Sequence, residues 1–242
     1  GQLQPQEIKH SIKVDQKVPK LGVMLVGWGG NNGSTFTAGV IANKKKLTWM
    51  TKNGQQKANF YGSLTQSVFA QIGYKKNGDG SLEDVYKLVK DIVPLVDPID
   101  IEITGWDISS LNIYDSCVRA QVIEPALVEQ LKPELSSLVP LKAVFNPKYI
   151  ASNQADRADN TFSGTNLQCI ERVRKDIQEF KSKVDKVVVL WTANTEEYYE
   201  REIASVAELD QLLKADTLLP ASVLYGYEIG RASCRERVSS PV

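Results

Sequence analysis

A glycine-rich turn between two apolar segments is the part of this sequence best suited to bind a phosphate group. Residues 27–33 read GWGGNNG, follow the apolar run 23–26, and precede a segment with apolar residues at helical spacing. A strand, a glycine turn and a helix, in that order, form the corner that holds the pyrophosphate of a dinucleotide. Glycines let the backbone approach the ligand closely, and the first N–H groups of the helix attract the anion.

The candidate residues of this turn are Gly29, Gly30, Asn31 and Asn32. The spacing departs from the usual GxGxxG pattern, because Asn32 occupies the third glycine position and the glycine follows at Gly33. A tight turn without a ligand is therefore an alternative. Asparagine amides hydrogen-bond phosphate or ribose without adding like charge, which favours a nucleotide site.

A second candidate is Asp107, which follows a strand expected at residues 101–103 and broken at Gly105. Ligands of open parallel sheets bind at the carboxyl ends of the strands, where an acid accepts hydrogen bonds from ribose or adenine. Counted along the sequence, the end of the second strand holds no such acid. Asp107 can instead cap the next helix.

The remaining pattern alternates between strands and helices. Apolar spacing predicts a helix over residues 82–93, ended by Pro94, and further helices over 113–131 and 170–180. A buried strand at 187–190 leads into a polar turn at 191–196. This order predicts an α/β fold with a right-handed, doubly wound and mainly parallel sheet.

Composition limits the classes of function. Lys+Arg and Asp+Glu are 29 each among 242 residues, which favours neither nucleic acid nor an anionic membrane as a partner. We expect no membrane span and no secretory leader, and residues 1–20 are expected to form a polar extension. Three scattered cysteines favour reduced thiols in the cytoplasm over a disulfide framework or metal site.

Five segments, in this order, resemble one family: LGVMLVGWGGNNGST, YGSLTQ, GWDIS, ASNQADRADN and VVVLWTANTE. The family is that of the myo-inositol-phosphate (inositol-3-phosphate) synthases, and the resemblance covers most of residues 20–227. It implies an NAD-binding Rossmann domain over residues 21–227, incomplete and lacking the family's separate α+β catalytic and tetramerisation domain.

The resemblance also implies which residues contact NAD. The glycine turn would hold the pyrophosphate and ribose, and Asp107 would contact the adenosine end. Val144 stands where an isoleucine commonly packs on adenine, and two further polar elements touch NAD in the family. The implied cofactor residues are Gly29, Gly30, Asn31, Asn32, Asp107, Val144, Gln154, Arg157, Thr192, Ala193, Asn194 and Thr195. The sequence departs from the family at Trp28, commonly leucine, and at Glu197, usually arginine.

The implied reaction converts D-glucose 6-phosphate to 1D-myo-inositol 3-phosphate, the first step of inositol biosynthesis. NAD-dependent oxidation, enolisation, aldol cyclisation and re-reduction leave no net NADH. The family's catalytic lysines would lie beyond this chain, so no catalytic residue and no metal ligand are expected here. The family also implies a cytoplasmic homotetramer. Two alternatives are another NAD-linked oxidoreductase and a non-catalytic NAD-binding module.

The last segment, residues 228–242, does not resemble the family. Residues 229–238 read IGRASCRERV, which is the translation of a common sequencing adapter. We therefore expect a non-native read-through tail from Ile229 onward, with a basic surface tail as the alternative.

Overall fold

The computed structural model describes residues 11, 13 and 15–237, and the side chains of 232–237 are outside the description. Residues 238–242 of the expected tail, and most of the first fourteen residues, lie outside the described part. The helices and strands follow the chain in this order: β1 (Leu21–Val26), α1 (Asn31–Lys44), β2 (Thr48–Thr51), β3 (Gly54–Lys57), β4 (Phe69–Lys76), β5 (Leu82–Leu88), η1 (Val89–Asp91), η2 (Pro98–Asp100), β6 (Glu102–Asp107), α2 (Ile113–Ala120), α3 (Pro125–Leu135), β7 (Leu141–Lys142), η3 (Pro147–Tyr149), α4 (Ser152–Ala155), α5 (Asn166–Lys181), β8 (Lys186–Trp191), α6 (Val206–Lys214) and α7 (Ala221–Arg237).

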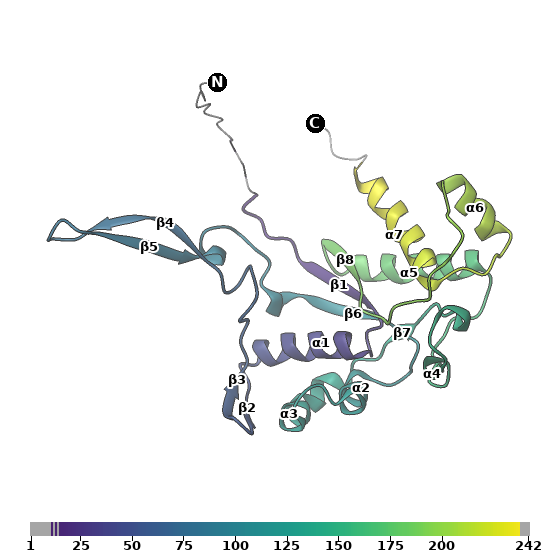
Figure 1. The fold of residues 1–242 in the computed structure, drawn as a ribbon, viewed down its shortest axis with the longest axis horizontal. Helices are drawn as coiled ribbons and strands as arrows, with labels where there is room; N and C mark the ends of the chain where they lie inside the picture. The colour runs from purple at the N-terminus through teal and green to yellow at the C-terminus, as the bar shows by residue number, and fades with distance from the viewer. Residues whose placement is uncertain (1–10, 12, 14, 238–242) are drawn as a thin grey trace. The chain divides into compact units, whose positions relative to one another are not determined.

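The chain divides into two compact units, each of which is described by itself. One unit contains Phe60–Asp97 together with the described residues before Lys20. The other contains Lys20–Asn59 and the chain from Pro98 onward. This second unit holds the parallel sheet and its helices (Figure 1).

The sheet of the second unit has four parallel strands in the order β7-β6-β1-β8. Val23 of β1 is paired with Ile103 of β6 on one side and Val188 of β8 on the other. Numbered by their appearance in the chain, the strands lie in the order 3-2-1-4, which is the first part of a doubly wound nucleotide-binding sheet. The predicted fold class is confirmed.

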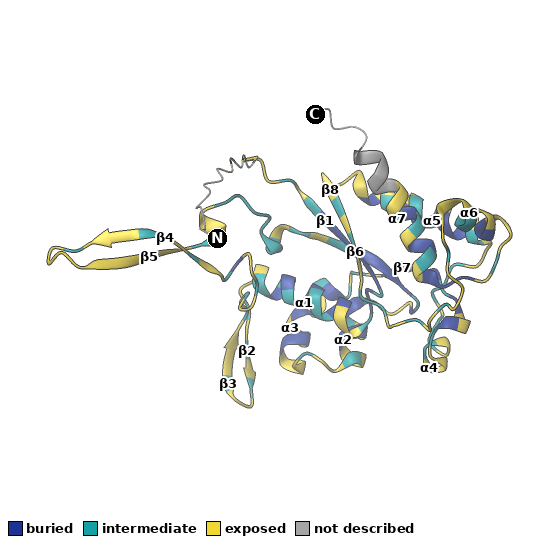
Figure 2. Ribbon diagram, turned by 45° about the horizontal axis from the view of Figure 1, so that its top comes forward, coloured by how far each residue is buried: buried dark blue, intermediate teal, exposed yellow. Residues whose placement is uncertain are grey.

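Two apolar layers cover this sheet. Successive side chains of β1 point to opposite faces, so Met24 and Val26 join one buried cluster while Val23 and Leu25 join the other. Helices α5, α6 and α7 supply the first cluster, and α1, α2 and α3 supply the second. Figure 2 shows the buried residues concentrated in the sheet and on the inner sides of these helices. A strand buried on both faces reads as a continuous apolar run, as residues 23–26 do.

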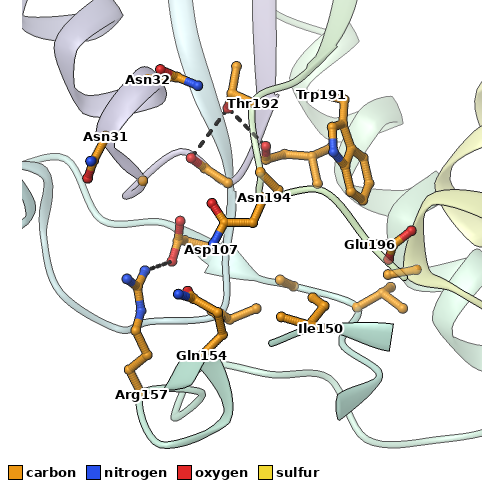
Figure 3. A pocket seen from close by; sticks show the side chains of 18 residues that line it. Asn31, Asn32, Asp107, Ile150, Gln154, Arg157, Trp191, Thr192, Asn194 and Glu196 are labelled. Carbon is orange, nitrogen blue, oxygen red and sulfur yellow. Dashed lines mark hydrogen bonds and ion pairs between the residues drawn. The ribbon is translucent and has the colours of Figure 1, made fainter. Parts of the chain in front are cut away.

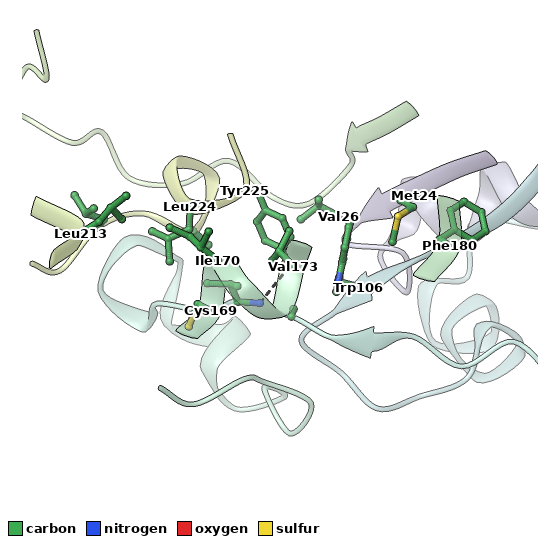
Figure 4. Close-up of a cluster of buried hydrophobic side chains, with 14 of the residues drawn as sticks. Met24, Val26, Trp106, Cys169, Ile170, Val173, Phe180, Leu213, Leu224 and Tyr225 are labelled. Atoms are coloured by element: carbon green, nitrogen blue, oxygen red, sulfur yellow. Dashed lines mark hydrogen bonds between the residues drawn. The ribbon is translucent and has the colours of Figure 1, made fainter. Parts of the chain in front are cut away.

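The first cluster is tied together by polar atoms as well as by packing. The ring centroids of Trp106 and Tyr225 lie 5.2 Å apart (Figure 4). The Trp106 indole also donates a 2.8 Å hydrogen bond to the buried carboxylate of Asp176. The Tyr225 hydroxyl accepts a hydrogen bond from the Val144 amide. Burial raises the pKa of Tyr225, so this hydroxyl stays protonated.

The predicted break at Gly105 is wrong, because β6 continues through it to Asp107. A Cβ atom at Gly105 would lie 2.2 Å from the Leu25 carbonyl oxygen of the neighbouring strand. The glycine is therefore required by close approach of β1, and not by a turn.

The helix predicted over residues 82–93 is also wrong. Residues 82–88 form β5, which pairs antiparallel with β4 around a turn at residues 77–80. Most residues of this hairpin are exposed. The apolar residues at helical spacing are therefore not buried together on one face, which is the arrangement that the helix prediction assumes. Hairpin pairing across a turn of Asn and Gly residues prevails over the helical spacing of a few apolar side chains.

The helical pattern over 113–131 is divided between α2 and α3. Gln121 ends α2 in the left-handed conformation with φ of 52°, and Pro125 begins α3. The structure therefore contains two helices where the spacing predicts one continuous helical segment.

Candidate functional site

A cavity of about 340 Å³ opens at the carboxyl ends of β1, β6 and β8 (Figure 3). All of the predicted cofactor residues except Gly29 and Thr195 line it. Its lining residues are Val26, Gly27, Gly30, Asn31, Asn32, Asp107, Ile108, Ala143, Val144, Ile150, Gln154, Arg157, Trp191, Thr192, Ala193, Asn194, Glu196 and Ala221. Parallel strands bring segments that are distant in sequence to one edge, so four separate sequence motifs meet around one cavity.

The glycine turn places the start of α1 at the edge of this cavity. Helix α1 begins at Asn31, within the glycine-rich segment 27–33. Its N-cap residue is Gly30, which has no side chain to cap the helix. The first amides of a helix are suited to bind an anion, and here Asn31 and Asn32 of the first turn of α1 line the cavity.

Gly33 explains the departure from the usual glycine spacing. A Cβ atom at this position would lie 2.4 Å from the Trp28 carbonyl oxygen. Gly33 therefore performs the close helix packing that the third glycine of a dinucleotide motif usually performs. Trp28 itself is buried, and its indole donates a 2.8 Å hydrogen bond to Thr37 Oγ1. The Trp28 ring is therefore buried with its N–H group hydrogen-bonded, so the structure accommodates a large side chain at this position.

Asp107 is the buried anionic group of the site. The residue is 2% exposed, and one carboxylate oxygen accepts a 2.9 Å hydrogen bond from the Ser109 amide. Burial raises the pKa of Asp107. The Ser109 hydrogen bond and the charge of Arg157, whose Nη2 lies 3.7 Å from the carboxylate, oppose that rise.

The position of Asp107 in the sheet corrects the sequence analysis. Strand β6 pairs directly with β1, so β6 is the second strand of the nucleotide-binding sheet although it is the sixth strand of the chain. Asp107 therefore occupies the usual place of the ribose-binding acid, which the sequence analysis takes to be empty. The hairpins β2–β3 and β4–β5 separate the two strands in the chain and hide this relation.

Residues after β7 form the wall that faces Asp107. Gln154 belongs to the short helix α4, and Arg157 follows that helix with its guanidinium directed toward Asp107 (Figure 3). Arg157 Nε is buried and makes no hydrogen bond to another residue of the described part of the chain. A buried N–H donor beside a cavity fits a ligand that brings its own acceptor.

The turn after β8 completes the cavity. The Thr192 amide and its Oγ1 each donate a 2.9 Å hydrogen bond to the Val26 carbonyl oxygen. Ala193 lies against Gly27, where a Cβ atom on the glycine would lie 2.7 Å from Ala193 Cα. These contacts hold the turn after β1 against the turn after β8. Asn194, in the second of these turns, points into the cavity.

Thr195 lines a neighbouring cavity of about 530 Å³ together with Glu196, Glu197, Tyr198 and Tyr199. Glu197, where the family resemblance implies arginine, lines only this neighbouring cavity and lies outside the lining of the first. Its amide donates a 2.7 Å hydrogen bond to the Tyr149 carbonyl oxygen.

Sequence reasoning missed several lining residues. Trp191 and Glu196 line both cavities on the side away from Arg157, and the Glu196 carboxylate accepts hydrogen bonds from the Ser222 amide in the first turn of α7. A carboxylate at a helix N-terminus stabilises the helix. Both residues are the end residues of the polar turn predicted at 191–196, so their place in that turn was a signal. Ile108 and Ile150 offered none, because they are apolar residues outside any motif.

Comparison with known proteins agrees with this geometry. A family model named for NAD binding, and described as Myo-inositol-1-phosphate synthase, matches residues 21–239. The chain belongs to the myo-inositol-1-phosphate synthase family. Within that family, Inositol-3-phosphate synthase 1 of Oryza sativa subsp. japonica is 48% identical over 229 residues, covering 92% of this chain and 44% of that protein.

Two further relatives of the family are similar to this chain. Inositol-3-phosphate synthase 1-A of Xenopus laevis is 48% identical over 215 residues, which are 88% of this chain and 37% of that protein. The crystal structure of inositol-3-phosphate synthase from Caenorhabditis elegans aligns with a TM-score of 0.81 and 39% identity, covering 88% of this chain and 42% of that chain. The chain therefore spans less than half the length of these synthases.

Among the described residues, none of the helices combines the length and the apolar character that a bilayer crossing requires.

Proposed function

We propose that this chain is the NAD-binding part of an inositol-3-phosphate synthase that acts on D-glucose 6-phosphate. The observation that carries the proposal is the convergence of Asp107 and the first turn of α1 on one cavity at the ends of β1, β6 and β8. An anion-binding helix terminus and a ribose-binding acid at adjacent strand ends are the two recognition elements of a dinucleotide site.

The residues present fit NAD. The amides at the start of α1, with Asn31 and Asn32, would hold the pyrophosphate, and Gly29 and Gly30 would let it approach. Asp107 would accept hydrogen bonds from the adenosine ribose. Val144 would pack against adenine. Further polar contacts would come from Gln154, Arg157, Thr192, Ala193, Asn194 and Thr195.

NAD, when bound, supplies a hydride acceptor for C5 of the sugar phosphate and later returns the hydride, so that no net NADH forms. The residues of this chain bind and orient the cofactor. Proton transfer and stabilisation of the enolate would fall to the family's lysines outside this chain. The proposal includes a cytoplasmic homotetramer, which rests on the family resemblance.

A chimera tests the whole proposal. Residues 1–227 are joined to the corresponding C-terminal part of the Oryza sativa relative, and the purified protein is given D-glucose 6-phosphate and NAD. We expect inositol phosphate to form without accumulation of NADH. Accumulating NADH would favour another NAD-linked oxidoreductase. NAD binding without turnover would favour a non-catalytic module.

We also infer that the segment from Ile229 within residues 228–242 is non-native, on the basis of its match to a translated adapter. Sequencing the 3′ end of the transcript beyond the Tyr227 codon tests this. A frame that continues into a lysine-containing domain would support the inference. A message that encodes residues 229–242 and then stops would contradict it.

A further inference from the structure

Arg119 contacts the glycine turn from outside the cavity. It lies in the last turn of α2, and its Nη2 donates a 2.7 Å hydrogen bond to the Gly29 carbonyl oxygen, 90 positions earlier in the chain. The residue as a whole is exposed, but this hydrogen bond is partly buried. Neither the glycine pattern nor the family motifs include Arg119.

This contact holds one peptide group from both ends. The carbonyl oxygen of the peptide between Gly29 and Gly30 accepts from Arg119, and the N–H of the same peptide donates a 3.0 Å hydrogen bond to the Gly27 carbonyl oxygen. A peptide with both polar groups bonded cannot rotate without losing a hydrogen bond. Gly30 is the N-cap of α1, so this peptide sets the direction in which the helix starts.

The packing around Gly29 leaves the turn little freedom. A Cβ atom at Gly29 would lie 3.0 Å from Ser116 Oγ and 3.2 Å from Asp107 Cγ. Ser116 and Arg119 are three residues apart on α2, which puts both on the side of the helix that faces the turn. The Gly29 amide also lowers the pKa of the Asp107 carboxyl, which fits this close approach. Arg119, Gly29 and Asp107 thus form one connected chain of contacts.

Charge connects the same groups. Arg119 and Arg157 both lower the pKa of Asp107, against the rise that burial causes. Burial lowers the pKa of Arg119, with a further lowering from Arg157, but an arginine remains charged. Burial raises the pKa of the Tyr225 hydroxyl, and the Asp107 charge raises it further, so this hydroxyl stays neutral.

We propose that Arg119 is a positioning residue of the NAD site, which fixes the Gly29–Gly30 peptide above Asp107 and supplies positive charge to that carboxylate. This inference rests on the proposed NAD binding. Arg119 does not line the cavity, so it would act through Gly29 and Asp107. An alternative is that Arg119 only anchors α2, without effect on the charge of the site.

The test measures NAD binding to the 242-residue chain by calorimetry at about pH 6 and about pH 8, for wild type, R119M and R119K. We expect R119M to weaken binding by about tenfold near pH 8, because a hydrogen bond from a charged donor is lost. At pH 6 the loss should be larger, since Asp107 without Arg119 takes up a proton at higher pH. R119K keeps the charge, so it should restore the wild-type pH dependence with only part of the affinity.

The control is R201M, which removes an exposed arginine that pairs with Glu208 instead of Asp107. It should bind NAD as wild type does. Wild-type affinity in R119M would overturn the inference alone. The inference would also be overturned if R119M lost the same NAD affinity at both pH values and R119K did not restore it. That result would mean that Arg119 only anchors α2. A wild-type chain that binds no NAD would overturn the proposed function and this inference with it. If R119M fails to fold, the pH dependence of R119K decides: a profile steeper than wild type overturns the inference.

Discussion

At the scale of single residues, Asp107 combines burial with a ligand-binding position. Its carboxylate is almost inaccessible to solvent, yet it lines the cavity and faces Arg157. A buried charge costs folding free energy, and such a cost is expected where a protein keeps a group for binding.

The raised pKa of Asp107 makes stability depend on pH. A carboxyl whose pKa is higher in the folded state contributes stability that is present below its unfolded pKa and lost as pH rises through the folded value. D107N cannot ionise at this position. Without NAD, its free energy of unfolding minus that of wild type should therefore increase as the pH rises from about 4 to about 7.5. Denaturant titrations at both pH values measure this. A difference that stays constant would contradict it.

Gly33 provides a test of packing at the turn. Since a Cβ atom there would meet the Trp28 carbonyl oxygen at 2.4 Å, G33A should lose about 3 kcal/mol of stability. The control is G39A in the same helix, where nothing lies within 4 Å and alanine should add about 1 kcal/mol. Thermal melts compare the two. If G33A were as stable as G39A, the close approach of α1 to the turn would be wrong.

At the scale of elements, one ion pair joins α7 to α5. Arg174 donates two hydrogen bonds to the buried carboxylate of Glu228, at 2.9 and 2.6 Å. Such a two-point contact fixes both the position and the rotation of α7 against α5. Helix α7 also carries Tyr225, which packs on Trp106 directly before the end of β6.

E228Q should therefore destabilise the chain by about 2 kcal/mol, because it leaves the guanidinium with a neutral partner in a partly buried place. E171Q is the matched control. Glu171 pairs with the same arginine, but its side chain is 67% exposed, so its loss should cost about 0.5 kcal/mol or less. Chemical denaturation of both variants measures the difference. Equal small losses would mean that the Glu228 pair is as weak as a surface pair.

At the scale of the whole molecule, β8 is an edge of the described sheet and carries exposed apolar side chains. Val188, Leu190 and Trp191 are each about two-fifths exposed. An edge strand with free backbone groups and apolar side chains favours pairing with another chain.

We expect the isolated chain to associate increasingly with concentration, and L190K to reduce that association because a charge on an edge strand opposes pairing. Light scattering after size-exclusion chromatography measures the mass of each species. L218K, which replaces an exposed leucine outside the sheet, should leave association unchanged. A wild-type chain that stays monomeric at every concentration would contradict the prediction.

The sequence by itself determined the parallel sheet, the glycine turn and the motifs that meet at the cavity. These features depend on local composition: a run of apolar β-branched residues predicts a buried strand, and polar residues directly after such strands gather at one edge of a parallel sheet. The family resemblance implied that Asp107, Arg157 and Asn194 share a site, and the three residues line one cavity.

Only the tertiary structure decided which strands are neighbours. The pairing of β6 with β1 makes Asp107 the acid of the second strand, and two inserted hairpins hide that relation in the sequence. Three other features also became clear only from the tertiary structure: the β4–β5 hairpin, the continuous strand through Gly105, and the contact of Arg119 with Gly29. Each depends on atoms of residues far apart in the chain or on pairing across a turn, and local side-chain periodicity carries no information about such partners.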